Sequence, residues 1–344
     1  MITKPTVVVV VVGAGASFDL GLPLGSVLQQ KVVAAVANSS SEAFRYFRAA
    51  AHNLFDKDGS RADAALARAQ RHVSGLRHAA SVDNYLDQVR SDTDFVSICK
   101  MAIGYEIAKA ESGSVIARQT SYDRVIDSAS DAEYFLLDLL NLAVRGHQEE
   151  NLEESLVNLT FIIFNYDRCV EKVLLSWLQM RFSNSAPHLF SQVKFVHVYG
   201  SLGPYGQIEG SEFFDSESSH GAVQNPHLTI PDFASRIKIF TEQEDSEVAE
   251  KIRNAIHFSQ AILFLGFGFE EQNMRFFRSP QSYAKRIFCT TVGKGRQNEL
   301  AISKSLMEMM GVDDDIGMIG GKAKRLFSEF YHPIGRAVGS LPVT

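Results

Sequence analysis

Residues 6–23 read TVVVVVVGAGASFDLGLP, and this stretch decides the fold class. Six successive valines form a short, wholly apolar, β-branched run, which is typical of a buried parallel strand. The run ends in the glycine-rich turn 13–17, which leads into a predicted helix. Such a turn places backbone N–H groups and a helix N-terminus where they can bind phosphate, although a tight turn without a ligand fits the same letters.

The turn matches two well-known phosphate-binding patterns only in part. It has no GK[ST] sequence and is therefore not a P-loop. The dinucleotide fingerprint GxGxxG would place its third glycine at position 18, where Phe18 stands. The turn alone therefore indicates a nucleotide site without fixing its type.

Strands and helices alternate over much of the chain. Runs 159–164, 193–198, 261–265 and 286–292 have the composition of buried strands, as 7–12 does. Segments 167–182 and 247–259 carry apolar residues at helical spacing between these strands. This alternation predicts an α/β fold with a Rossmann-like, doubly wound parallel sheet.

A helical stretch interrupts this alternation after the first strand–helix unit. We expect a nucleotide-binding domain of residues 1–43 and 156–344, with a helical module of residues 44–155 inserted for assembly or regulation. The helices expected in the module are 44–55, 63–78, 82–89, 95–110 and 132–147, with a polar interval at 111–130. A second polar stretch, 203–232, is long enough to be a lid, a binding loop or a disordered segment.

Composition narrows the class of protein. The formal net charge of -6 over 344 residues argues against charge-driven binding to nucleic acid. Cys99, Cys169 and Cys289 lie far apart without a CxxC pair, which suits a reducing cytosol and excludes a four-cysteine zinc site. The valine run is far shorter than the about 20 apolar residues that span a membrane. We therefore expect a soluble cytoplasmic protein that contacts neither membrane nor nucleic acid directly.

Polar and glycine-rich turns follow each predicted strand. The strand ends read GAGAS, FNYD, HVYGSL, GFGF and TVGKG. Carboxyl ends of parallel strands share one edge of the sheet, where ligands bind in open α/β folds. Asn165, Asp167 and His197 each fit a structural role when taken alone, but their shared edge favours a reactive site. Histidine is the side chain best suited to act as a base near neutral pH.

The order of these motifs resembles one known family. The glycine turn followed by Gly21-Leu22-Pro23, then Asn165-Tyr166-Asp167, then a histidine before Tyr199-Gly200-Ser201, resembles the sirtuin-like nucleotide domain. The likeness is closest to bacterial sirtuin-like NAD-hydrolysing effectors of anti-phage defence. SVDNYL at 81–86 and LFLGFGFEEQN at 263–273 also look like members of that group.

The resemblance implies NAD as substrate and a set of binding residues. The first turn would hold the diphosphate, Asn165 and Asp167 would line the nicotinamide end, and the turn after a late strand would approach the adenosine. The catalytic candidates are then Asn165, His197 and Asp167. The NAD-binding candidates are Gly13, Ala14, Gly15, Ala16, Ser17, Gly200, Ser201, Gly266, Gly268 and Asn273.

Two departures from the family bear on the reaction. Tyr199 precedes Gly200 where sirtuins carry histidine, and residues two apart in a strand share a face. Either His197 or Tyr199 can therefore fill the base position. Residues 203–232 contain no cysteine where sirtuin deacylases carry a four-cysteine zinc module. We expect no metal, and the set Asp215, His220 and His227 is not favoured as a metal site.

Without the zinc module, water is the expected acceptor. The resemblance then implies a regulated NAD glycohydrolase that forms nicotinamide and ADP-ribose and depletes NAD during anti-phage defence. It also implies a homo-oligomer and a separate HerA-type ring ATPase as partner. Two alternatives stay open: a non-catalytic sensor or scaffold that binds NAD or ADP-ribose, and a nuclease or DNA-handling subunit of a defence complex.

Overall fold

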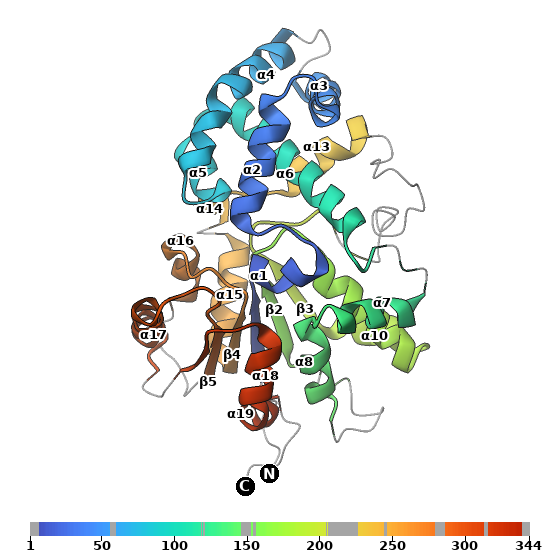
Figure 1. Cartoon of the computed structure of the whole chain (residues 1–344), viewed down its shortest axis with the longest axis vertical. Helices are drawn as coiled ribbons and strands as arrows, with labels where there is room; N and C mark the ends of the chain where they lie inside the picture. The colour runs from blue at the N-terminus through green and yellow to red at the C-terminus, as the bar shows by residue number, and fades with distance from the viewer. Residues whose placement is uncertain are drawn as a thin grey trace.

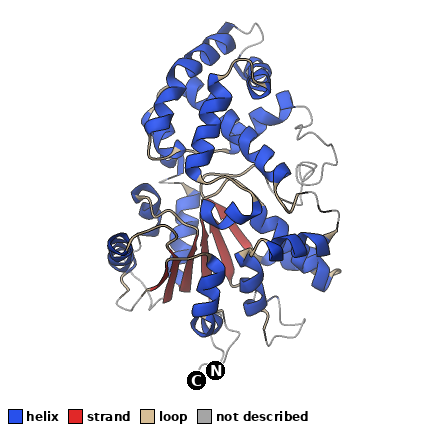
Figure 2. Cartoon of the chain, in the orientation of Figure 1, coloured by secondary structure: helices blue, strands red, loops and turns tan. Residues whose placement is uncertain are grey.

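A six-stranded parallel sheet forms the centre of the fold (Figures 1 and 2). The computed structural model describes residues 7–55, 60–117, 119, 121–145, 153, 156–203, 205, 226–243, 246–278, 286–312 and 316–338. Its strands are β1 (Val7–Val12), β2 (Leu159–Ile163), β3 (Lys194–His197), β4 (Ser259–Leu265), β5 (Arg286–Thr290) and β6 (Gly317–Ile319). Their order is β3-β2-β1-β4-β5-β6. This is the strand order of dinucleotide-binding Rossmann domains, so the predicted fold class is confirmed.

The valine run forms the central strand, as predicted. Val10 pairs with Phe161 of β2 on one side and with Leu263 of β4 on the other. Val9 and Val11 belong to one hydrophobic cluster, and Val8, Val10 and Val12 belong to a second cluster on the opposite face. Because both faces of β1 are covered, the strand carries no polar alternation.

Helices cover both faces of the sheet (Figure 1). One cluster includes buried residues of α15 (Glu247–Phe258) and α17 (Arg296–Met310). The opposite cluster contains buried residues of α7 (Tyr122–Asp131), α8 (Phe135–Ala143), α10 (Cys169–Phe182), α11 (Ala186–Gln192), α18 (Ala323–Glu329) and α19 (Tyr331–Ala337). The expected polar interval at 111–130 is wrong in its second half, because α7 lies there. Val125 and Ala129, four residues apart, bury the inner side of this short amphipathic helix.

A second group of helices lies beyond the carboxyl ends of the strands (Figure 1). Its members are α2 (Gly25–Ala37), α3 (Glu42–Phe55), α4 (Ser60–His72), η2 (Val73–His78), α5 (Val82–Gln88), α6 (Thr93–Gly113) and α13 (Pro226–Arg236). Helix α6 runs through its middle and is buried on nearly all sides from Phe95 to Ala108. Helices α2 and α13, which lie outside the predicted module of residues 44–155, also pack against α6.

The remaining short helices are α1 (Ala14–Ser17), η1 (Phe18–Leu20), α14 (Phe240–Gln243), α16 (Glu271–Met274) and η4 (Arg275–Phe277). Most of the polar stretch 203–232 lies outside the described residues, apart from 203, 205 and the helix that begins at Pro226. Within the described part of the chain no single helix is long and apolar enough to cross a membrane. The pair 14–20 and 25–37, bent by 76°, passes that test of length and composition only when combined.

Candidate functional site

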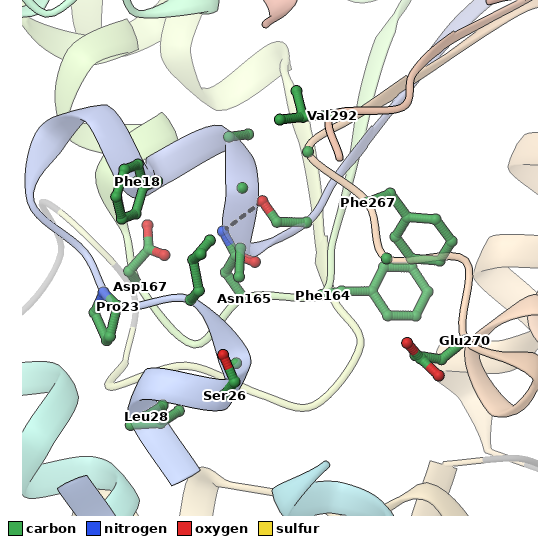
Figure 3. Close-up of a pocket in the computed structure, with 18 of the residues that line it drawn as sticks. Phe18, Pro23, Ser26, Leu28, Phe164, Asn165, Asp167, Phe267, Glu270 and Val292 are labelled. Carbon is green, nitrogen blue, oxygen red and sulfur yellow. Dashed lines mark hydrogen bonds between the residues drawn. The ribbon is translucent and has the colours of Figure 1, made fainter. Parts of the chain in front are cut away.

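A cavity of about 600 Å³ opens at the carboxyl edge of the sheet, between the strand ends and the helical group (Figure 3). It lies beside the ends of β1 and β4, where the strand order reverses, and this is the position of ligands in open α/β sheets. Its polar and charged lining residues are Asp19, Ser26, Ser81, Asp83, Glu133, Asn165, Tyr166, Asp167, Tyr199, Glu270, Asn273, Thr290, Thr291, Lys294 and Lys322.

The glycine turn after β1 packs directly on the turn after β4. The Gly13 N–H donates to the Leu265 carbonyl at 2.9 Å, and the Gly15 N–H donates to the Gly266 carbonyl at 3.0 Å. A Cβ added at Gly13 would lie 2.5 Å from the Gly266 carbonyl oxygen. Close backbone approach therefore requires glycine here with or without a ligand. The phosphate-binding role of Gly13, Ala14, Gly15 and Ala16, all of which line the cavity, stays a prediction.

The turn after β2 is hydrogen-bonded to the glycine turn. Asn165 Nδ2 donates to the Gly13 carbonyl and to Ser17 Oγ, both at 3.2 Å, and Ser17 Oγ donates to Asp167 Oδ1 at 3.1 Å. In Figure 3, Asn165 and Asp167 lie close together, while Phe164 points away toward Phe267. The structure thus brings Asn165, Asp167 and the glycine turn together at one site.

Burial changes the chemistry of Asp167. The residue is 4% exposed, and loss of solvation raises its carboxyl pKa, although hydrogen bonds from Cys169 and Ser17 act in the opposite direction. Its Oδ1 accepts the backbone N–H of Cys169 at the start of α10. Asp167 therefore ties the cavity wall to α10 as well as facing the cavity.

His197 is directed away from the cavity. Its Nε2 lies 2.6 Å from Glu171 Oε1 of α10, and its Nδ1 lies 3.3 Å from the Asn165 carbonyl oxygen. Burial opposes its protonation, but the charge and hydrogen bond of Glu171 raise the His197 pKa above the usual value. The cavity lining includes Tyr199 and does not include His197.

The expectation that His197 and Tyr199 share a face is wrong. Strand β3 ends at His197, so the alternation of a strand does not extend to residue 199. Tyr199 belongs to the hydrophobic cluster that contains Val9 and Val11, and its hydroxyl donates to Asn273 Oδ1 at 2.6 Å. His197 therefore contacts the backbone carbonyl of Asn165, and its ring does not line the cavity.

The remaining predicted residues divide between the cavity and its support. Gly266, Gly268 and Asn273 line the cavity, whereas Gly200 and Ser201 do not. Gly200 has φ of 78°, and a Cβ there would lie 1.9 Å from the Arg236 carbonyl oxygen. This glycine allows α13 to approach the end of β3.

One wall of the cavity comes from α5 of the helical group. Ser81 caps this helix by accepting the Asn84 N–H at 3.1 Å, and Asp83 follows in the first turn. The Tyr166 hydroxyl donates to Asp83 Oδ1. Burial raises the pKa of Asp83 to about 6, although the Tyr166 hydrogen bond acts in the opposite direction. Sequence reasoning singled out SVDNYL but missed Asp83 as a site residue, because only tertiary packing places α5 beside the turn after β2.

Two lysines supply positive charge at the other end of the cavity. Lys322 Nζ lies 2.7 Å from Asp19 Oδ1. Lys294 follows β5 and makes no ion pair with any residue that the structure describes. The motif TVGKG predicts the end of a strand, but Lys294 is not among the predicted site residues. The lysine was recognisable only from its place after a strand.

A buried ion pair supports the turn from behind. Arg168 Nη2 lies 2.6 Å from Glu111 Oε2, and the Arg168 backbone N–H donates to Glu111 Oε1 at 2.8 Å. Glu111, in the last turn of α6, is fully buried, and Arg168 is 2% exposed. The pair therefore joins the helical group to the turn that carries Asn165 and Asp167.

The fold and the cavity define a Rossmann-like α/β protein with a ligand-sized crevice at the strand-order reversal. The sequence matches no protein-family model, and no curated protein matches it. Over the described ranges, no three His, Cys, Asp or Glu side chains are grouped so that they could hold a metal ion. The set Asp215, His220 and His227 lies outside the residues whose side chains are described.

Proposed function

We propose that this chain is an NAD glycohydrolase that cleaves the nicotinamide–ribose bond to form nicotinamide and ADP-ribose. One observation carries the proposal: Asn165 and Asp167 are hydrogen-bonded to the glycine turn inside a cavity at the strand-order reversal. Nucleotides bind at this position in Rossmann domains. The resemblance to sirtuin-like effectors supplies the choice of NAD.

The cavity offers complementary groups for NAD. Its volume of about 600 Å³ lies within the usual range of small-molecule pockets. In our proposal the diphosphate lies near the first turn of α1, and Lys294 and Lys322 add positive charge at that end. The nicotinamide lies near Asn165 and Asp167. Gly268 and Asn273 lie along the adenosine side.

Asn165 has the geometry of a positioning group. The Gly13 carbonyl can only accept a hydrogen bond, so Asn165 must turn its Nδ2 toward it. This orientation leaves the amide Oδ1 to accept a hydrogen bond from a water or a ribose hydroxyl. Bound nicotinamide is cationic and leaves readily, so most of the rate enhancement comes from placing water and ribose correctly.

The test is release of nicotinamide from NAD by the purified chain, measured by chromatography. We expect release by the wild-type chain and loss of release in Asn165→Ala, with exposed Asn254→Ala as the matched control. Equal release by Asn165→Ala would place the reaction elsewhere. A wild-type chain that binds neither NAD nor ADP-ribose would refute the proposal.

The position of His197 favours one alternative function. Its ring pairs with Glu171 instead of facing the cavity, and a site without that base fits a sensor or scaffold subunit that binds NAD or ADP-ribose without turnover. Tight binding of NAD with no nicotinamide released under any condition would support this second candidate.

The proposed biological setting rests on the resemblance. It comprises a cytoplasmic effector of anti-phage defence that assembles as a homo-oligomer and works with a HerA-type ring ATPase. Co-purification of the chain with such an ATPase, together with a change in nicotinamide release on mixing, tests the partnership. Unchanged release and separate elution would contradict it.

A further inference from the structure

Helix α5 is fixed to the nucleotide-binding fold by polar contacts along its length. In its first turn Asp83 accepts the Tyr166 hydroxyl. Asn84 Nδ2 donates to Gln272 Oε1 of α16 at 3.3 Å, and Asp87 Oδ1 accepts the Thr241 N–H of α14 at 3.2 Å. These contacts hold the α5 N-terminus at the cavity in a defined orientation.

The carboxylates that line the cavity differ in the hydrogen bonds and ion pairs that they already make. Asp167 Oδ1 already accepts hydrogen bonds from Ser17 and from the Cys169 N–H. Asp19 is paired with Lys322, and Glu133 is paired with Lys324. Asp83 lines the cavity, and among the residues that the structure describes its carboxylate makes one side-chain hydrogen bond, from the Tyr166 hydroxyl to Oδ1.

Glu270 also lines the cavity but is a weaker candidate for a catalytic group. Glu270 is exposed, so solvent competes for the hydrogen bonds that its carboxylate can accept. Asp83 is partly buried in the first turn of α5, and it accepts a hydrogen bond from Tyr166, the residue between Asn165 and Asp167. Asp83, Asn165 and Asp167 therefore line one cavity, and Asp83 contacts the side chain of the residue between the other two.

We propose that Asp83, supplied by the helical group, is the general base of the site and takes the position that the sequence left open between His197 and Tyr199. The inference rests on the proposed NAD hydrolysis. It also gives the helical group a direct part in the reaction, because the sheet alone lacks this carboxylate.

The step is balanced in atoms and charge. The oxygen of a water forms a bond to ribose C1′ while the C1′–N bond breaks. The electron pair of that bond neutralises the pyridinium, which leaves as nicotinamide. The water proton passes to the Asp83 carboxylate and then to solvent, so the products are nicotinamide, ADP-ribose and one proton.

Other titratable groups lie near Asp83. Burial raises the pKa values of the Tyr166 and Tyr199 hydroxyls well above 10, so both stay protonated where Asp83 titrates. Glu242 of α14 is paired with Lys100 of α6, and Glu106 of α6 is paired with Lys31 of α2. Further charged or titratable groups on α5 and on elements that contact it are Asp87, Glu270, Glu271, Arg275, Asp92, Asp94, His72, Arg77 and His78.

The pKa of Asp83 near 6 fits this role. A general base must be deprotonated, so kcat should be maximal above that value and should fall as the pH drops through it. The Tyr166 hydrogen bond lowers the pKa of Asp83. Removing it in Tyr166→Phe should therefore shift the acidic limb of the profile to higher pH.

The experiment compares Asp83→Asn with Asp87→Asn on the same helix. Asparagine at 83 can still accept the Tyr166 hydrogen bond, and asparagine at 87 can still accept the Thr241 N–H. We expect Asp83→Asn to lower kcat by about 100-fold or more and to abolish the acidic limb, which is the usual size of general-base catalysis. ADP-ribose affinity, measured by calorimetry, should stay near the wild-type value, and Asp87→Asn should behave as wild type.

The outcomes separate the two proposals. If the wild-type chain hydrolyses NAD and Asp83→Asn keeps its kcat and its acidic limb, the role of Asp83 is refuted while NAD hydrolysis stands. An equal loss of kcat in Asp87→Asn also refutes it, because the effect then belongs to the helix as a whole. A wild-type chain that releases no nicotinamide, either alone or mixed with the ring ATPase, refutes both proposals.

Discussion

Gly266 is the position where a single methyl group should disturb the site most. The residue has φ of 59°, and an added Cβ would lie 2.0 Å from the Ala16 nitrogen and 2.4 Å from the Gly15 carbonyl carbon. Both neighbours are backbone atoms, so no side-chain rotation relieves the clash. Gly266→Ala must therefore push the glycine turn and the turn after β4 apart.

The cost has two parts. A left-handed backbone costs a non-glycine residue roughly 1–2 kcal/mol. Overpacking that moves backbone costs about 1–3 kcal/mol. Together they predict that Gly266→Ala lowers the free energy of unfolding by about 2–5 kcal/mol. The separation of the turns should also weaken binding of NAD.

Gly268→Ala is the matched control two residues away. A Cβ at that position would lie 3.8 Å from Glu270 Cγ, which is ordinary van der Waals contact. Urea unfolding followed by circular dichroism measures both variants. A Gly266→Ala chain within about 0.5 kcal/mol of the wild-type value, the usual range for neutral surface changes, would refute the proposed backbone contact.

Three further changes test other parts of the structure. Glu111→Ala removes the buried carboxylate that pairs with the Arg168 guanidinium and should lower the free energy of unfolding by about 3–5 kcal/mol in urea. A loss under about 1 kcal/mol would show that the pair is solvated. The His197 pKa is raised in the folded chain, so pairing with Glu171 stabilises the fold fully below about pH 6.5 and less as the pH rises through the raised value. The stability difference between the wild-type chain and His197→Gln should shrink with rising pH, and a difference that grows would contradict the pairing. Lys294→Ala should weaken NAD binding by about tenfold, which is equivalent to about 1.4 kcal/mol. The loss of affinity should be larger at low salt than at high salt, because salt screens the charge of the lysine. Unchanged affinity, measured by calorimetry, would show that this lysine does not contact NAD.

Most of the sheet is predictable from local sequence. The valine run of β1 and the apolar run of β2 are buried on both faces, so composition alone identifies them. Strand β6 is not predictable in this way, because Gly317–Ile319 is three residues long and carries no pattern. Helix α7 escapes notice because only Val125 and Ala129 mark its buried side.

The site is predictable only where strand topology fixes it. Asn165 and Asp167 follow β2 directly, so the parallel sheet places them at the carboxyl edge. The direction of His197 depends on the strand ending there, and this has no local signal. The place of Asp83 depends on how α5 packs across the cavity, which is a contact between residues 83 and 166 that no short-range pattern encodes.

The most direct test of NAD hydrolysis is to incubate the wild-type chain with NAD in water enriched in oxygen-18 and to measure the masses of the products by mass spectrometry. We predict free nicotinamide together with ADP-ribose that carries a single oxygen-18 atom, and neither product with Asn165→Ala. Recovery of intact NAD from the wild-type chain, or ADP-ribose without the label, would contradict hydrolysis at this site.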